Sequence, residues 1–271
     1  MLTDALGTTH PPAGPGARIV SLVPSITELL FALDLGAETV GRTSFCIHPR
    51  DRVRQVPAVG GTKDVRLDDV RALAPTHVIV NVDENLQEAA EALRTFIPHV
   101  VVTHPNAPED NLPLYQLLGG LFDRVDRAEA LAADLQRELD LCAAVEWPRE
   151  RVLYLIWKDP WMTVAGDTYI ARALATVGWD VPHGPGGATG AARYPVLADL
   201  EAEIARVQRV LLATEPFRFR ESHAHDLAVR HPGVPVELID GEMTSWYGPR
   251  AIAGLPYLRE RRRAACQPAL E

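Results

Sequence analysis

The sequence predicts an α/β protein built from two Rossmann-like lobes with parallel sheets, joined by one long helix. Short apolar runs alternate with helical patterns in both halves of the chain. Strand landmarks recur about 135 positions apart, as from Ile19 to Val152 and from Val78 to Val210. A helical pattern without interruption lies between the halves. We therefore expect a disordered tail over residues 1–16, an N-terminal lobe over 17–122, a connecting helix over 123–147 and a C-terminal lobe over 148–271.

The first half begins with a strand-to-helix pattern. The apolar run RIVSLV (18–23) ends at Pro24, and Ser25-x-x-Glu28 follows as the capping-box pattern that starts a helix. The elements expected next are an extended segment at 39–42, a helix at 67–73, a strand at 77–82, a helix at 84–96 and a strand at 99–104.

The second half repeats this order. Its expected elements are a strand at 151–157, helices near 168–177 and 199–207, a strand at 209–214, a helix near 221–230 and a strand at 236–240. The recurrence favours two similar lobes, although any α/β chain shows some coincidences of this kind.

The segment between the halves, residues 123–146, has apolar side chains at helical spacing and no Gly or Pro until Pro148. At 1.5 Å per residue, a helix of this length is a rod of roughly 30 to 37 Å. A rigid connector of this kind permits only small hinge movement between the lobes.

Composition excludes several classes. The chain of 271 residues carries a net charge of -9, which gives no basic surface for nucleic-acid phosphates. Three widely spaced cysteines, Cys46, Cys142 and Cys266, argue against both a disulfide framework and a structural zinc site. No apolar stretch is long enough to span a membrane, and residues 1–16 do not resemble a signal peptide. As written, the sequence predicts a cytoplasmic protein, which we expect to be a monomer.

Candidate ligand-binding residues lie in the loops that follow the strands, because parallel sheets bind ligands beyond the carboxyl ends of their strands. Three tryptophans fall in these loops and suit a flat or bulky ligand, although Trp161 and Trp246 could also serve as packing. Cys46 and His48 could bring a sulfur and an imidazole to one metal; the alternative is a packed thiol and a loop histidine. The predicted ligand-binding residues are Ser25, Cys46, His48, Lys63, Glu84, Asn85, His104, Trp157, Trp161, Tyr194, Glu215, Phe217, Trp246 and Tyr247.

Enzyme motifs are absent from the sequence. It contains no G-x-S-x-G elbow, no phosphate-binding G-x-x-x-x-G-K-[ST] loop, no H-E-x-x-H helix and no G-x-G-x-x-G after a strand. We therefore expect a protein that is not an enzyme, has no catalytic residues and carries no intrinsic cofactor.

Three segments resemble the cobalamin and ferric-siderophore receptors, the helical-backbone periplasmic-binding proteins of ABC importers. They are RIVSLVPSITELLFALDLG (18–36), VGGTKDVRLDDVRALAPTHVIVN (59–81) and RVLYLIWKDPWMTVAGDTYIARAL (151–174). The resemblance implies two Rossmann-like lobes bridged by one helix, and acids that dock onto permease arginines, here Asp68 and Glu201. For both acids the alternative is a charge that complements a helix dipole. Family members are normally periplasmic or lipid-anchored. The position of the Trp that packs on the corrin in cobalamin receptors falls near Thr62 or Lys63 here, so that contact is absent from this chain.

The function that these observations favour is capture of cobalamin, a related corrinoid or an iron chelate such as haem or a siderophore. The ligand would lie in an inter-lobe cleft and pass to an ABC importer. A second hypothesis is a cytosolic metal or tetrapyrrole carrier, sensor or enzyme on the same fold. A third is an unrelated α/β enzyme.

Overall fold

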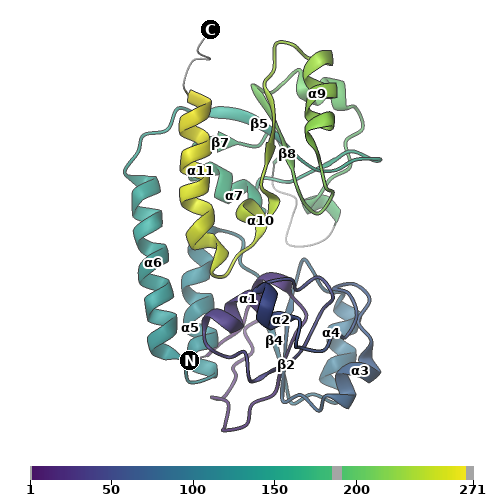
Figure 1. The fold of residues 1–271 in the computed structure, drawn as a ribbon, viewed down its shortest axis with the longest axis vertical. Coiled ribbons are helices and arrows are strands. Elements are labelled where there is room, and N and C mark those ends of the chain that lie inside the picture. Colours follow the sequence, from purple (N-terminus) through teal and green to yellow (C-terminus); the bar gives the residue numbers. More distant parts are fainter. Residues whose placement is uncertain (1, 185–190, 267–271) are drawn as a thin grey trace. The chain divides into compact units, whose positions relative to one another are not determined.

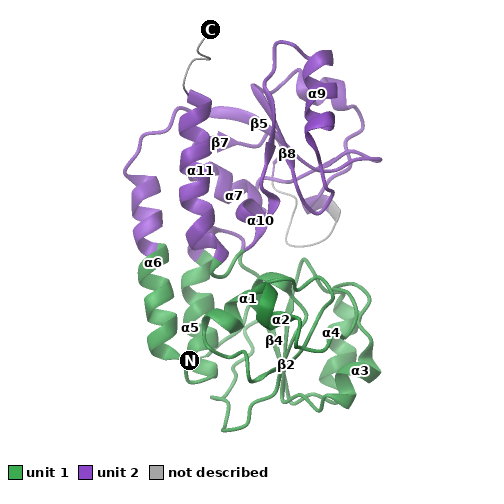
Figure 2. Ribbon diagram, in the orientation of Figure 1, with its two compact units in different colours: residues 1–105, 110–135, 247–249 green, residues 106–109, 136–246, 250–271 purple. Residues whose placement is uncertain are grey.

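Two compact α/β units make up the chain (Figure 2). The computed structural model describes residues 2–184 and 191–266. Unit 1 comprises the residues up to Pro105, then Asp110–Leu135 and Tyr247–Pro249, and unit 2 comprises Asn106–Glu109, Gln136–Trp246 and the residues from Arg250 onward. These boundaries differ from the expected lobes, because helix α6 (Val125–Ala143) contributes to both units and a short piece of the second half belongs to unit 1.

Unit 1 contains a four-stranded parallel sheet in the order β2-β1-β3-β4. Three of its strands match the predicted positions within one residue at either end, whereas the first covers only Ile19–Ser21 of the predicted run 18–23. The elements are β1 (Ile19–Ser21), α1 (Pro24–Ala32), β2 (Thr39–Arg42), α2 (Arg50–Val53), α3 (Leu67–Ala72), β3 (His77–Asn81), α4 (Gln87–Arg94), β4 (His99–Thr103) and α5 (Asn111–Leu121).

The core of unit 1 explains why α3 and α4 lie on the same face of this sheet (Figure 1). Alternate residues of the strands, such as Val78 and Val80, pack against Val70 of α3 and Leu93 of α4. Successive strand side chains point to opposite faces, so one set of valines serves this layer. The carboxyl ends of the strands remain open to the loops that follow them.

The segment before β1 does not behave as the disordered tail that we expected. The backbone amide of Ala5 donates to the Val102 carbonyl at 2.9 Å, and the amide of Ala13 donates to the Leu121 carbonyl at 2.7 Å. The buried carboxylate of Asp4 accepts further hydrogen bonds from this segment. Composition suggested a loose segment, whereas these long-range bonds hold it against unit 1.

Unit 2 contains a second mostly parallel sheet in the order β6-β5-β8-β9, with β7 pairing in parallel with the start of β5. The pairing of β7, β5, β8 and β9 follows the order of β2, β1, β3 and β4 in unit 1, which agrees with the recurrent strand spacing. The elements are β5 (Glu150–Trp157), β6 (Met162–Thr163), α7 (Tyr169–Ala175), β7 (Trp179–Asp180), the 3-10 turns at Pro108–Asp110 and Ala191–Arg193, α8 (Leu200–Ile204), β8 (Arg209–Ala213), α9 (Glu221–Arg230), β9 (Val236–Ile239), α10 (Gly241–Ser245) and α11 (Arg250–Cys266).

The predicted connecting helix is confirmed as α6, which runs without a break from Val125 to Ala143. Its buried side chains include Ala128 and Leu135. The sequence analysis did not anticipate α5, which precedes α6 and buries Tyr115 and Leu118. The analysis also missed α11, whose apolar pattern is weakened by a run of arginines.

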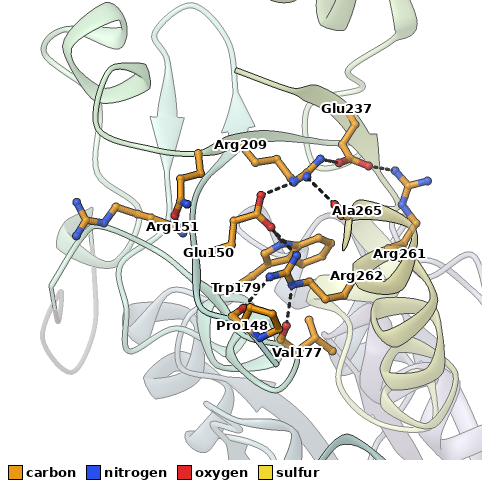
Figure 3. Close-up of polar contacts among 11 residues, drawn as sticks. Pro148, Glu150, Arg151, Val177, Trp179, Arg209, Glu237, Arg261, Arg262 and Ala265 are labelled. Atoms are coloured by element: carbon orange, nitrogen blue, oxygen red, sulfur yellow. Dashed lines mark hydrogen bonds and ion pairs between the residues drawn. The ribbon is translucent and has the colours of Figure 1, made fainter. Parts of the chain in front are cut away.

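Those arginines attach α11 to the amino-terminal ends of β5, β8 and β9 in unit 2 (Figure 3). Glu150 at the start of β5 accepts from Arg209 Nε at 2.9 Å and pairs with Arg262 Nη1 at 2.7 Å. Glu237 of β9 pairs with both Arg209 and Arg261. The network therefore ties the C-terminal helix to the sheet edge opposite the one where the candidate site lies.

No helix within residues 2–184 and 191–266 has the length and apolar character needed to cross a membrane. Cys46, Cys142 and Cys266 are all free thiols, the first two buried and the third exposed.

Candidate functional site

The carboxyl edge of the unit 1 sheet gathers several predicted site residues. Ser25 follows β1, Glu84 and Asn85 follow β3, and His104 follows β4. Because all four strands are parallel, these loops open onto the same edge, which is where such sheets bind ligands.

A small charged cluster lies at this edge. The ammonium of Lys63 donates to the Asp83 backbone carbonyl at 2.8 Å, and His104 Nε2 lies 3.5 Å from Asp83 Oδ2. Partial burial lowers the pKa of Lys63, although the carboxylates of Glu84 and Asp83 oppose that shift. The edge therefore offers both signs of charge to a polar ligand group. Asp83 was not among the predicted ligand-binding residues. It lies directly before Glu84 and contacts both Lys63 and His104.

Tyr247 is part of unit 1 and is held at this edge by a hydrogen bond to Glu84. Its hydroxyl donates to Glu84 Oε1 at 2.7 Å and its side chain is buried. The next residue, Gly248, donates its amide to Asn111 Oδ1 at 2.5 Å and accepts from the Tyr115 hydroxyl at 2.7 Å. Tyr247 was expected to offer an open aromatic face, but the structure uses its ring in packing and its hydroxyl to hold Glu84.

Two other predicted ligand residues are structural. Asn85 donates to the carbonyls of Leu22 at 3.1 Å and Thr62 at 3.0 Å, and accepts from the Asn81 amide at 2.8 Å. Both protons of its side-chain amide are therefore used within the fold, where they help to hold three loops together. Ser25 is 2% exposed, and its hydroxyl has no hydrogen-bond partner among the described residues.

Cys46 is a packed thiol, so the predicted metal pair of Cys46 and His48 is not supported. Its sulfur lies 3.0 Å from the Thr27 hydroxyl and 3.2 Å from the Thr43 hydroxyl, and its side chain belongs to a small apolar cluster with Phe31. Burial raises the pKa of the Cys46 thiol and so disfavours the thiolate, which is the form that metals bind. Across the described parts of the chain, no group of three or more His, Cys, Asp or Glu side chains is arranged to hold a metal ion.

Aromatic side chains dominate the corresponding edge of unit 2. Trp157, at the end of β5, is 39% exposed and meets the Phe217 ring edge-on at 5.6 Å. Trp161 stacks on Phe219 at 5.9 Å with an interplanar angle of 8°. We call this set, together with His223 of α9, the aromatic cluster; it comprises Trp157, Trp161, Phe217, Phe219 and His223.

The sequence analysis identified three members of the aromatic cluster and missed two. Phe219 and His223 were overlooked because the segment FRFR (217–220) was not recognised as alternating. Its phenylalanines lie two positions apart with Arg218 between them, and the Phe219 amide donates to the Phe217 carbonyl at 2.9 Å, a turn across which the two rings meet at 4.7 Å. His223 then packs edge-on against Phe219 at 5.6 Å.

Trp246 is buried, at 8% exposure, and is not an open binding surface. Its indole Nε1 donates to Glu215 Oε1 at 2.5 Å, and the Ser245 hydroxyl donates to the same oxygen at 3.1 Å. Burial raises the pKa of the Glu215 carboxyl, against the lowering effect of these two hydrogen bonds. The structure therefore favours the packing alternative for Trp246, whose hydrogen-bond partner Glu215 is partly buried. Tyr194, after the second 3-10 turn, is partly buried.

The two predicted docking acids differ in their surroundings. Asp68, in the first turn of α3, has a side chain that is 95% exposed and lies 3.2 Å from Arg71. Glu201, in the first turn of α8, pairs with Arg230 at 2.5 Å and with His231 at 2.8 Å. Asp68 is therefore open to a partner, whereas Glu201 is held by Arg230 and His231.

Comparisons with known proteins agree with this fold. The chain is 25% identical over 202 residues to the vitamin B12-binding protein of Vibrio parahaemolyticus, covering 74% of this chain and 71% of that one. It is 24% identical over 258 residues to an uncharacterised ABC transporter substrate-binding lipoprotein, YvrC, of Bacillus subtilis, covering 90% and 79%. The crystal structure of a periplasmic heme binding protein from Pseudomonas aeruginosa superposes with a TM-score of 0.76 at 22% identity, covering 93% of this chain and 94% of that one.

These relatives give no support to the expected cytoplasmic location, since one is named a lipoprotein and another periplasmic. The sequence model for periplasmic binding proteins matches residues 19–181, which is more than half of the chain. With its two α/β units and its continuous helix α6, this chain belongs to the periplasmic binding protein family.

Proposed function

We propose that this chain is the substrate-binding component of an ABC importer and that its ligand is a tetrapyrrole, foremost cobalamin or a related corrinoid. The name of the Bacillus subtilis relative supports the role in an ABC importer, and the name of the Vibrio parahaemolyticus relative supports cobalamin as the ligand. The observation that carries it is the aromatic cluster at the carboxyl edge of unit 2, with Trp157 partly open to solvent.

The aromatic cluster suits a broad, mostly apolar ligand. Trp157 offers 39% of its surface although it is already packed against Phe217, so a ligand could cover the rest without rearranging the core. Lys158 lies 5.9 Å from the centre of the Trp161 ring and places a cation at the rim, where peripheral amide or carboxylate groups of a macrocycle would lie. In unit 1 the charged cluster of Lys63, Asp83 and His104 offers polar groups of both signs at the carboxyl edge of its own sheet.

His223 is not suited to coordinate the metal at the centre of such a ligand. Its Nδ1 accepts the backbone amide of Arg220 at 3.0 Å, so in the neutral ring the other nitrogen carries the proton and has no free lone pair. We infer that unit 2 holds the macrocycle by its face and rim, without a bond to its metal.

Visible absorption spectroscopy tests the ligand class directly. The protein is incubated separately with cyanocobalamin, haem and a ferric hydroxamate, then desalted, and the spectrum of the protein fraction is recorded. We expect cobalamin to be retained. Retention of haem or the ferric chelate alone would assign the iron-chelate alternative, and retention of none would refute the proposal.

The role of the aromatic cluster is tested by titration. Trp157→Ala is expected to weaken cobalamin binding by roughly thirtyfold, since truncating an aromatic anchor costs about 2 kcal/mol. Val229→Ala on α9, where Val229 is 65% exposed, is the control and should bind like the parent. Equal affinities for all three proteins would exclude this surface as the site.

We also propose that the chain has no enzymatic activity. Burial covers the Cys46 thiol and raises its pKa, which disfavours the nucleophilic thiolate, and family members are binding proteins. No turnover of small esters, phosphates or nicotinamide substrates is expected. Reproducible turnover that is lost in His104→Ala would contradict this.

For the permease we propose Asp68 as a contact, with Glu201 as the corresponding residue of unit 2. Asp68→Lys should lower ligand-dependent ATPase stimulation of the reconstituted importer while leaving ligand affinity unchanged. Glu88→Lys reverses another exposed charge, on α4, and serves as the control. If Asp68→Lys stimulates like the parent, Asp68 is not a docking residue.

A further inference from the structure

Residues 2–16, which we call the strap, lie against unit 1, and two of them bond to the outer edge of β4. The Ala5 amide donates to the Val102 carbonyl at 2.9 Å, and the Val102 amide donates to Asp4 Oδ2 at 3.1 Å. Strand β4 ends the sheet order β2-β1-β3-β4, so these bonds occupy backbone groups that an edge strand would otherwise leave open.

One buried carboxylate fastens the strap. Asp4 Oδ1 accepts from the amides of Leu6 at 3.0 Å and Thr8 at 2.9 Å, and Oδ2 lies 3.0 Å from His10 Nε2. The side chain of Asp4 is 0% exposed and that of His10 is 4% exposed. The strap is thus folded around Asp4, and His10 is carried into the interior with it.

His10 completes a group of three imidazoles, which we call the histidine cluster: His10, His77 and His99. The rings of His77 and His99 stack at 4.7 Å, and the rings of His10 and His99 meet edge-on at 6.3 Å. His77 Nδ1 lies 2.8 Å from the Thr76 hydroxyl, whereas its Nε2 is buried with no partner among the described residues. Burial, and secondarily the neighbouring His99 and His10, lower the pKa of His77 to about 4.

The other groups around His77 do not provide a counter-charge. The Phe122 ring covers it edge-on at 5.1 Å. Arg18, next to the start of β1, directs its guanidinium to the backbone carbonyls at the end of α3. Arg124 after α5 is paired with Glu38 at 2.9 Å, so that carboxylate is already engaged.

We propose that the histidine cluster makes the strap a pH-sensitive clasp, closed at neutral pH and released on acidification, so that the edge of β4 becomes accessible. A proton on His77 would place a cation inside a stacked imidazole pair, without water and without a free carboxylate. Release of the strap moves His10 away and lets water reach the stacked pair, so the open state accepts the proton more readily. Acid therefore favours the open state by linkage.

Amide hydrogen exchange of the full chain, analysed by mass spectrometry and corrected for the intrinsic exchange rate, measures the open fraction. For one proton taken up on opening, the open population grows about tenfold per pH unit below the ordinary histidine pKa of about 6.5. Protection of peptides from the strap should therefore fall roughly thirtyfold between pH 7 and pH 5. Peptides from β8 in unit 2 should keep their protection.

Variants assign the effect to the cluster. His77→Gln should reduce the fall in strap protection to less than about threefold, because no buried imidazole is left at that position to take up the proton. His99→Gln removes the stacked partner and is a second variant if His77→Gln does not fold. His225→Gln, at an exposed histidine of α9, should behave like the parent.

Three results would overturn the proposal. The first is strap protection in the parent that does not change with pH. The second is a fall in strap protection that is as large as in the parent in those of His77→Gln and His99→Gln that fold. The third is a parallel loss of protection in β8, which would indicate global acid unfolding.

Discussion

Glu150→Gln removes a carboxylate that three partners share in unit 2, so we expect it to lower the stability of that unit. Glu150 accepts from Arg209 Nε at 2.9 Å and from Trp179 Nε1 at 2.9 Å, and pairs with Arg262 Nη1 at 2.7 Å (Figure 3). The side chains of Arg209 and Arg262 are 11% and 4% exposed. Glutamine keeps the volume of the side chain but removes the only carboxylate that the described contacts give to Arg262.

The expected cost follows from the charge that is left behind. Arg209 keeps its pair with Glu237, but Arg262 keeps only the backbone carbonyls of Val177 at 3.2 Å and Pro148 at 2.7 Å. Breaking a buried ion pair on one side costs about 3 to 5 kcal/mol. Since the two backbone carbonyls and the amide oxygen of the new glutamine remain as acceptors, we expect the free energy of unfolding of unit 2 to fall by about 3 kcal/mol.

Urea unfolding followed by tryptophan fluorescence measures this loss, because Trp179 is itself a partner of Glu150. With an m-value of about 2 kcal/mol/M, the midpoint should fall by about 1.5 M. Asp68→Asn, at a carboxylate that is 95% exposed, is the control and should stay within about 0.5 kcal/mol of the parent.

A double variant tests the reasoning itself. Glu150→Gln combined with Arg262→Met removes both charges, so it should be more stable than Glu150→Gln alone. A single variant within about 1 kcal/mol of the parent, or a double variant that is the less stable of the two, would refute the buried-charge explanation.

The other predictions concern single sites. Burial raises the pKa of Glu215, so the parent loses stability as pH rises through that pKa and the carboxyl ionises. The Tm of Glu215→Gln minus the Tm of the parent should therefore be larger at pH 8 than at pH 4. A Tm difference that is the same at both pH values would contradict this. Cys46→Ala should leave cobalt or zinc binding unchanged, measured by calorimetry, because the thiol is packed and its burial disfavours the thiolate; a lost site would restore the metal hypothesis. Gly60→Ala should lower the free energy of unfolding by at least about 1 kcal/mol, since Gly60 has φ +109° and an added Cβ would lie 2.2 Å from the Asp64 carbonyl oxygen. Gly14→Ala, where a Cβ meets nothing within 4 Å, should be close to neutral by the same urea assay.

The sequence by itself determined the order of the main strands, the helix between the halves and the division into two similar halves. Strands β3 and β4 are runs of valine between turn residues, and the pattern of α6 continues for 19 residues without Gly or Pro. These features depend on neighbours along the chain, so periodicity reveals them without a structure. The same pattern located the loops that follow the strands. It also showed that the loops of the second half are rich in aromatic residues.

The tertiary structure alone decided which residues of those loops are open to a ligand. Trp157 and Trp246 look alike in the sequence, yet one is 39% exposed while the other is 8% exposed and donates to Glu215. Burial of this kind is set by partners 31 or more positions away, which no local pattern encodes. The same reason explains the strap, where Asp4 bonds to Val102, 98 positions distant, and the arginines of α11, whose carboxylates lie on three separate strands or helices. A charged run resembles a solvated surface until the fold brings its counter-ions to it.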